Sequence, residues 1–444
     1  MSANASERAS GSVRWLGSVA ELTGDARRAL FERTSSDGDA AIRARTSSIV
    51  SDVRRGGDAA LRALAATLDG VSLTSLEVST AECASALSSL DPTLRSAMER
   101  SARNIRRVHE AFKPEAQETE SEQGIVIGRR PDPLGRVGVY APGGRAAYPS
   151  SVLMGVIPAR IAGVGEVIVC SPPSRETGRP SDVVLAAASL AGADRVFALG
   201  GAGAIAAMAY GTTSVPRVDR IVGPGNAYVA EAKLQVASAV AIDSPAGPSE
   251  LLVLADDTAD PALVAREMMA QAEHDPLAAV VAVVGSERLA TEVVRAIEKA
   301  LPSQPRSDIV ATALAAQGAV LWTAAMPEAV SFANEYAAEH LLLVVAEPEV
   351  VLPRLRNAGT IFVGAFASVA FGDYMTGANH VLPTGGLARS YSGLSTLDFV
   401  RWTTYQHVTR AAAARMADDV GIFADAEGLG GHALAARAWR EGAS

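Results

Sequence analysis

The sequence is poor in cysteine, and it lacks the long apolar run that a membrane helix needs. Only Cys83 and Cys170 occur in 444 residues, too few for a disulfide framework and typical of a reducing compartment. No stretch reaches the roughly 20 uninterrupted apolar residues of a membrane-spanning helix. The first residues contain no apolar segment of the signal-peptide kind. These absences lead us to expect a soluble, cytoplasmic protein without a membrane partner.

Positive charge is also in deficit. The chain has 40 Lys and Arg against 49 Asp and Glu, which gives a formal net charge of −9. Because binding to nucleic-acid phosphates needs clustered Lys and Arg, this balance disfavours a nucleic-acid partner. With 48% hydrophobic and 20% charged residues, the composition is that of a globular protein, and the length predicts two or more packed units.

The sequence does contain an alternation of β-branched runs and alanine-rich helical stretches, beginning near Gly124. This rhythm is typical of βαβ units in a parallel sheet that is covered on both faces. A first set of predicted strands covers residues 136–140, 166–170, 195–199 and 219–222, with helices at 150–162, 181–190, 204–210 and 227–238. A second set of predicted strands covers residues 251–255, 279–284, 319–322, 341–345 and 360–363.

The regions that flank these two sets have a different pattern. After a polar leader of about 15 residues, residues 20–115 show helical periodicity with one short strand predicted near Leu76. The region after Leu394 is predicted to be helical and without strands. Because this tail has little core of its own, we expect it to dock on another surface, such as that of a partner subunit.

The six histidines differ in their surroundings. His274 closes a helical pattern that Pro276 ends, and Gln271 lies on the same helical face three residues earlier. Such an oxygen and nitrogen pair can form half of a metal site, although these residues at this spacing are more often surface residues. Asp373 in Phe-Gly-Asp-Tyr is either a turn or capping residue, or a carboxylate that Gly372 brings close to another group.

The pair Glu339-His340 is chemically attractive, although its position is ambiguous. A neutral imidazole can take a proton from an alcohol, and an adjacent carboxylate can orient water. The pair opens a predicted strand, whereas clefts in open α/β sheets lie at the carboxyl ends of strands. A polar helix–strand junction is therefore an equally good interpretation of the pair alone. His432 lies in a loop rich in glycine, where an exposed, flexible histidine is the simpler interpretation.

Three glycine turns each follow a predicted strand and precede a predicted helix. Gly201, Gly203 and Ala206 match the pattern G-x-G-x-x-A, and further turns occur at 141–144 and 223–226. This spacing suits an approach of the backbone to a pyrophosphate, but no acidic residue follows a strand about 20 positions on. Each turn is weak evidence alone, whereas three such loops in one sheet favour ligand binding. Cys170 has no neighbouring base or cation, and we predict that it packs in the core.

Seven segments together resemble histidinol dehydrogenase, from about Gly135 to the C-terminus. They are Gly-Val-Tyr-Ala-Pro-Gly-Gly, Val-Gly-Pro-Gly-Asn-Ala-Tyr-Val, Ala-Gly-Pro-Ser-Glu, Gln-Ala-Glu-His-Asp, Tyr-Ala-Ala-Glu-His-Leu, Gly-Asp-Tyr and Asn-His-Val-Leu-Pro-Thr. The resemblance implies an α/β fold with two Rossmann-like, aldehyde-dehydrogenase-like parallel-sheet domains and small helical N- and C-terminal domains. We expect an N-terminal arm at 1–35, one α/β domain from 36–138 and 251–394, a second at 139–250 on the NAD side, and a tail at 395–444.

The resemblance further implies a homodimeric NAD-dependent oxidoreductase that oxidises L-histidinol through L-histidinal to L-histidine with two NAD⁺, the last step of histidine biosynthesis. Glu339 would activate water and His340 would act as the general base. The other implied roles are zinc binding by Gln271, His274, Asp373 and, from the partner subunit, His432; NAD contact by Tyr140 and Asn226; and substrate contact by Ser249 and Glu427 together with His340 and the zinc ligands.

Two departures from the family pattern and two rival functions remain. Gly203 stands where the family has a glutamine that contacts NAD, and residues 366–371 replace a segment that usually contains proline.

One rival is a paralogue that oxidises another small primary alcohol, such as a sulfonated diol, but Glu427 suits an ammonium group and repels a sulfonate. The other rival is a non-catalytic zinc-binding scaffold, which would not need Glu339 and His340. The ligand types suit Zn²⁺ without excluding Mn²⁺ or Co²⁺.

Overall fold

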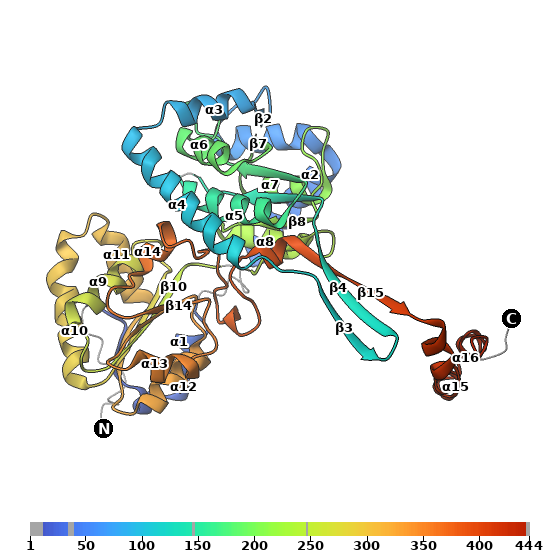
Figure 1. The fold of residues 1–444 in the computed structure, drawn as a ribbon. Helices are drawn as coiled ribbons and strands as arrows, with labels where there is room; N and C mark the ends of the chain where they lie inside the picture. The colour runs from blue at the N-terminus through green and yellow to red at the C-terminus, as the bar shows by residue number, and fades with distance from the viewer. Residues whose placement is uncertain (1–11, 34–39, 144–146, 246, 441–444) are drawn as a thin grey trace.

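The structure is a computed structural model that describes residues 12–33, 40–143, 147–245 and 247–440. It contains two six-stranded sheets with helices packed around them, and a ribbon of three strands that leads away to a pair of helices (Figure 1). Among the described residues, no helix is both long enough and apolar enough to cross a bilayer. Residues 1–11 of the expected polar leader lie outside the described residues.

One sheet, in what we call the β5 unit, is formed by the first set of predicted strands. The strand order is β2-β7-β6-β5-β8-β9, and all neighbours are parallel except β2 and β7. The strands are β2 (Glu77–Val78), β5 (Arg136–Tyr140), β6 (Glu166–Ser171), β7 (Arg195–Ala198), β8 (Arg220–Val222) and β9 (Ala241–Ile242), with helices α5 (Pro149–Ala162), α6 (Asp182–Ala191), α7 (Gly201–Tyr210) and α8 (Ala227–Val236). Each strand of the first predicted set is confirmed to within one residue at either end.

The other sheet, in what we call the β10 unit, is parallel throughout, in the order β1-β12-β11-β10-β13-β14. Strands β10 and β11 are buried along their whole length, as expected for a parallel sheet that is covered on both faces. The strands are β1 (Trp15–Ser18), β10 (Glu250–Ala255), β11 (Ala279–Val284), β12 (Gly318–Trp322), β13 (His340–Val344) and β14 (Thr360–Val363). The helices are α1 (Gly24–Phe31), α9 (Pro261–Ala272), α10 (Glu287–Ala300), α11 (Ser307–Gln317), α12 (Met326–Tyr336), α13 (Pro348–Val351) and α14 (Val369–Tyr374).

The expected division into domains is wrong at the N-terminal side. Helices α2 (Ala40–Leu64), α3 (Thr80–Ser88) and α4 (Pro92–Ala111) pack mainly on the helices of the β5 unit, although Asn104 of α4 also donates to the Met375 carbonyl. Their apolar faces, which include Ile49, Leu61 and Ile105, join the same core cluster as β5 and β6. The arm expected at 1–35 is likewise not separate, because β1 pairs with β12 along its whole length. Helical periodicity predicted these helices but not the surface that they cover.

The expectation of a C-terminal tail without strands is also wrong. Strand β15 (Val400–Val408) pairs antiparallel with β4 (Ile125–Pro133), and β4 pairs with β3 (Gln117–Glu122). These strands carry the helices α15 (Arg410–Ala426) and α16 (Gly430–Arg437) away from both units (Figure 1). We call β3, β4, β15, α15 and α16 the arm. Because β3 and β15 have almost no buried side chain, the sequence shows no apolar alternation there.

Candidate active site

The pair Glu339-His340 lies at the start of β13, directly beside the start of β10. Leu251 is the register partner of His340 in this parallel pair. The main chain of Glu250 contacts both members of the pair: its N–H donates to Glu339 Oε2 at 2.7 Å, and its carbonyl oxygen lies 3.0 Å from His340 Nδ1. Both side chains are buried. The first residue of β10 therefore fixes both members of the expected dyad.

The contact with Glu250 selects one tautomer of His340. A carbonyl oxygen only accepts hydrogen bonds, so Nδ1 must carry the proton and Nε2 must keep its lone pair. Nε2 is buried without a hydrogen-bond partner in the described residues, and it lies 3.8 Å from Asp373 Oδ1. Burial lowers the pKa of His340 to about 3. The imidazole is therefore neutral near pH 7, as a general base must be.

The two carboxyl groups near His340 are also perturbed. Burial, together with the charges of Glu250 and Asp373, raises the pKa of Glu339 well above its ordinary value, against the opposing hydrogen bond from the Glu250 amide. Burial raises the pKa of Asp373 to about 7. Carboxyl groups shifted in this way are typical of sites that exchange protons or bind cations.

The last turn of α9 brings further polar groups to this place. Gln271 is buried, and its amide Nε2 has no hydrogen-bond partner in the described residues. His274 is exposed, yet desolvation by the surrounding atoms lowers its pKa. Its charge also acts on His340 and on His380, lowering the pKa of both. We call Gln271, His274, His340, Asp373 and His380 the polar cluster.

His380 was not predicted as a site residue. Its Nδ1 lies 3.0 Å from the carbonyl oxygen of Asp373 in α14. His380 therefore helps to hold the main chain of Asp373 in place. Burial lowers the pKa of His380 to about 4. The only sequence signal was its place in the segment Asn-His-Val-Leu-Pro-Thr, which carries the family resemblance without assigning a role.

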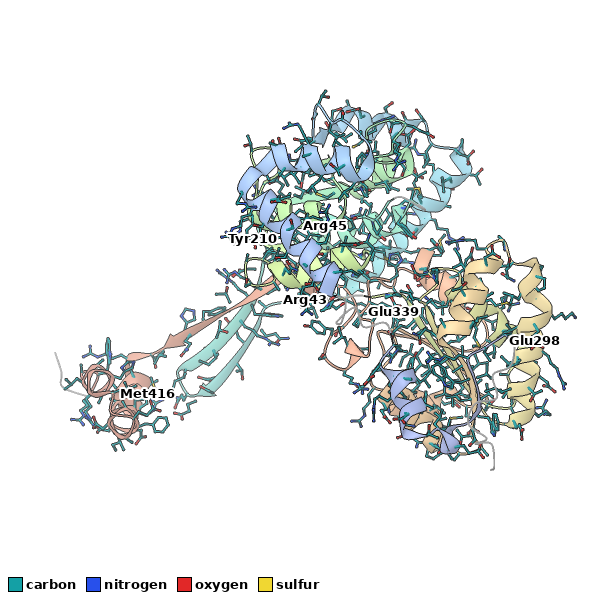
Figure 2. The ribbon with its side chains drawn as sticks, turned by 180° about the vertical axis from the view of Figure 1, so that it is seen from behind. Arg43, Arg45, Tyr210, Glu298, Glu339 and Met416 are labelled. Atoms are coloured by element: carbon teal, nitrogen blue, oxygen red, sulfur yellow. The ribbon has the colours of Figure 1, made fainter. Side chains whose placement is uncertain are left out.

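Two expected site residues are absent from this cluster within one chain. Glu427 caps the end of α15 and His432 lies in α16, and both are exposed. Met416 on α15 is far from Glu339, which lies on the side of the β10 unit that faces the β5 unit (Figure 2). The expectation of a flexible loop at His432 is wrong, because this residue is in the first turn of α16. Among the described residues of one chain, no group of three His, Cys, Asp or Glu side chains is placed to hold a metal.

A cavity of about 920 Å³ lies in the β5 unit and is lined by Tyr140, Asn226 and the turn at 200–203. This volume is in the range of small-molecule and cofactor sites. The hydroxyl oxygen of Tyr140 accepts from the Gly201 N–H at 3.0 Å, and Asn226 caps α8 by accepting from two backbone N–H groups. The cavity lies at the carboxyl ends of the parallel strands, where such folds bind ligands.

Gly203, where the resemblance led us to expect a glutamine, lies in the lining of this cavity. A Cβ atom at this position would lie 3.1 Å from Leu64 Cδ1 on α2. Leu64 and Leu68 therefore form an apolar wall close to the turn, and a longer side chain at 203 would require Leu64 to move. Cys170, by contrast, is fully buried at the end of β6, and burial raises the pKa of its thiol. The prediction that Cys170 packs in the core is confirmed.

We predict that Gly223→Ala destabilises the β5 unit. Gly223 has φ +114°, and a Cβ atom there would overlap the carbonyl oxygen of Tyr140. The strained conformation and the overlap together should lower the free energy of unfolding by about 2 kcal/mol or more, measured by thermal denaturation. Gly192→Ala is the matched control, because Gly192 has φ +83° but open space around its Cβ position. An equal loss in both variants would contradict the role of the Tyr140 contact.

The fold and the dyad together indicate a class of protein. Two parallel-sheet units, one with a glycine-lined cavity and one with a buried neutral histidine beside a carboxyl group, are typical of an oxidoreductase that uses a dinucleotide. The sequence profile of the family described as histidinol dehydrogenase matches residues 32–440.

Individual relatives agree with the profile. A histidinol dehydrogenase of Natronomonas pharaonis is 51% identical over 416 residues, covering 94% of this chain and 97% of that protein. One of Methanosarcina barkeri is 47% identical over 392 residues, covering 88% and 90%. The crystal structure of histidinol dehydrogenase from Elizabethkingia anophelis has a TM-score of 0.90 at 33% identity, covering 94% of this chain and 96% of that one. The chain is an NAD-dependent oxidoreductase, and it belongs to the histidinol dehydrogenase family.

Proposed function

We propose that this enzyme oxidises L-histidinol through L-histidinal to L-histidine, with two NAD⁺ reduced per molecule of substrate. The observation that carries the proposal is the buried dyad, in which the Glu250 main chain holds both Glu339 and His340 and leaves His340 Nε2 without a hydrogen-bond partner in the described residues. The family assignment supplies the substrate. It also removes support from a non-catalytic scaffold, because the relatives are named as dehydrogenases.

In the first step, His340 Nε2 takes the proton of the substrate's hydroxyl group. At the same time, the carbon atom that carries this hydroxyl group loses a hydride to NAD⁺. The products of this step are the aldehyde, NADH and an imidazolium. The Glu250 carbonyl supports the charged ring, because it accepts a hydrogen bond from Nδ1–H before and after the transfer. The proton must leave His340 before the next turnover.

In the second step, Glu339 orients and deprotonates water for addition to the aldehyde. The resulting hydrate loses a second hydride to a second NAD⁺ and a proton to a nearby base, which yields the carboxylic acid. The Glu250 N–H, which donates to Glu339 Oε2 at 2.7 Å, holds the carboxyl group in place for this role. The two steps therefore use the two members of one dyad.

The residues present fit a divalent cation. Gln271, His274 and Asp373 would supply an amide oxygen, an imidazole nitrogen and a carboxylate, and His432 of the partner subunit would complete four ligands, a set that suits Zn²⁺. The buried Gln271 amide has no hydrogen-bond partner for its nitrogen in the described residues, so it is not held by hydrogen bonds as an ordinary core glutamine is, and its oxygen could turn to a cation. When bound, zinc would hold the amino alcohol in place for the transfer.

The arm supports a homodimer with shared sites. Its two terminal helices expose large apolar side chains, among them Ile422 (64% exposed), Phe423 (71%) and Leu434 (74%). Apolar side chains gathered on an exposed surface in this way are typical of a protein–protein interface. A second copy of the chain would cover it and would bring His432 and Glu427 to the polar cluster. Ser249, just before β10, would complete the contacts with the substrate, and Tyr140 and Asn226 would contact NAD in the cavity.

We predict that the purified enzyme forms two NADH per L-histidinol consumed and contains one zinc ion per chain. NADH is counted by absorbance at complete conversion, and zinc by elemental analysis. Starting instead from L-histidinal should give one NADH, which controls for the second step. A ratio of one with histidinol, or a specificity constant no better than that for a sulfonated diol, would contradict the proposal. The cytoplasmic location and the absence of nucleic-acid and membrane partners stay predictions.

A further inference from the structure

Arg33 is a residue of the N-terminal segment whose side chain is buried inside the β10 unit. Its side chain is only 1% exposed, and that of its ion-pair partner Glu250 is fully buried. Arg33 Nη2 donates to Glu250 Oε2 at 2.9 Å and to the carbonyl oxygen of Tyr336 at 2.7 Å. Its guanidinium carbon also lies 3.5 Å from the centre of the Tyr336 ring. A buried cation with this many contacts is tightly fixed.

Glu250 connects this ion pair to the dyad. Its side chain accepts from Arg33 through Oε2 and from the Gly385 N–H through Oε1 at 2.5 Å. Its main chain, described above, contacts Glu339 and His340. A displacement of the Glu250 side chain would therefore move the two main-chain groups that hold the dyad.

The segment before the dyad is strained, and Arg33 contacts it as well. Ala337 has φ +52°, the only described residue other than glycine in the left-handed region. Such a conformation is unfavourable for alanine, and surrounding contacts must maintain it. Arg33 supplies two, to the carbonyl oxygens of Tyr336 and Ala337. Arg33 thus joins the end of α12, which precedes Glu339 in the sequence, to the start of β10, which contacts Glu339.

We infer that the Arg33–Glu250 ion pair is the positioning element of the dyad. It holds the starts of β10 and β13 in register, so that His340 keeps its proton on Nδ1 and presents Nε2 as the basic atom. The inference rests on the proposed function. Arg33 contacts neither substrate nor cofactor in this arrangement, and it acts only through Glu250 and the strained segment.

The kinetic test compares Arg33→Met with a matched control. We expect Arg33→Met to lower kcat by about 10- to 100-fold, since small displacements of catalytic groups have effects of this size, with KM for histidinol changed by less than about threefold. Arg33→Lys keeps the positive charge but loses the several N–H donors of the guanidinium group. Its kcat should lie between those of the wild type and Arg33→Met. Arg27→Met is the control, because Arg27 lies on α1 and pairs with Glu335 at the surface. It should leave kcat unchanged.

A spectroscopic test separates positioning from mere stability. In the wild type, ¹⁵N chemical shifts of the imidazole should show His340 protonated at Nδ1, with the signal assigned by its loss in His340→Ala. In Arg33→Met the same ring should show a mixture of tautomers. A wild-type tautomer with normal kcat in a folded Arg33→Met variant would overturn the inference, as would a loss of kcat with the tautomer unchanged.

Two further measurements keep the result decisive. If Arg33→Met does not fold because Glu250 loses its buried ion-pair partner, Arg33→Met combined with Glu250→Gln removes the carboxylate charge, and the same criteria apply to the double variant. Wild-type enzyme assayed in parallel separates the two claims. No oxidation of histidinol by the wild type would contradict the proposed function, whereas an active wild type with equally active Arg33 variants would contradict only the inference.

Discussion

Replacing His340 with alanine should lower kcat by about 10²-fold or more, the range for loss of a general base. The residue is neutral, because burial lowers its pKa to about 3, and its Nε2 has no hydrogen-bond partner in the described residues. No other described imidazole is held in this way against the Glu250 carbonyl. Fold and zinc content should be unchanged, as measured by circular dichroism and elemental analysis, since His340 is not among the proposed ligands.

Added imidazole provides a control for this variant. A small base that enters the space left by the ring should restore part of the turnover of His340→Ala, and it should do nothing for the wild type. Turnover in the variant equal to that of the wild type would contradict the assignment of His340. Loss of zinc together with turnover would instead place His340 among the metal ligands.

Replacing His432 with alanine should have an effect of similar size by a different route. The proposal puts His432 of the partner subunit in the zinc site, so the variant should purify as a dimer with most of its zinc lost and little turnover. His407→Ala is the matched control, because His407 is exposed on β15 of the same arm. It should keep zinc and activity. Full zinc content in His432→Ala would contradict the shared site.

A mixture of two inactive variants gives the sharpest test of sharing. When His340→Ala and His432→Ala chains are denatured and refolded together, half of the dimers should be mixed. Each mixed dimer should have one site with both defects and one site with none, so the mixture should recover roughly a quarter of wild-type activity. Sites formed within single chains would give no recovery, which the same assay would detect.

The sequence predicted the parts of the molecule where side-chain periodicity carries the information. The central strands are buried on both faces, so their continuous apolar runs located them to within one residue. The arm gave no such signal, because β3 and β15 are exposed. The covering of the β5 unit by α2, α3 and α4 was missed for a related reason: an apolar helix face such as that of Ile105 indicates burial, but not the surface that it is buried against.

The sequence could likewise place only some residues of the polar cluster together. Gln271 and His274 are three residues apart on one helix, so the sequence could place them together. Asp373 and His340 come from different elements, and only the family motifs connected them before the structure did. Arg33 had no motif at all. Its role depends on a contact with Glu250, which is 217 residues away in the sequence. It also depends on a contact with the carbonyl oxygen of Ala337, whose backbone is in the left-handed region. Neither contact can be seen in a local sequence pattern.

The pairing of β1 with β12 has a consequence for biosynthesis of the chain. Trp15 leaves the ribosome early, but its register partner Ala319 follows about 300 residues later, and closing so long a loop is slow. The strands of the β5 unit end at Ile242, so this unit can begin to fold while the rest is still being translated, although Val381, Leu394 and Phe399 join its core later. A nascent chain can therefore form its cavity before β12 emerges to pair with the N-terminal strand.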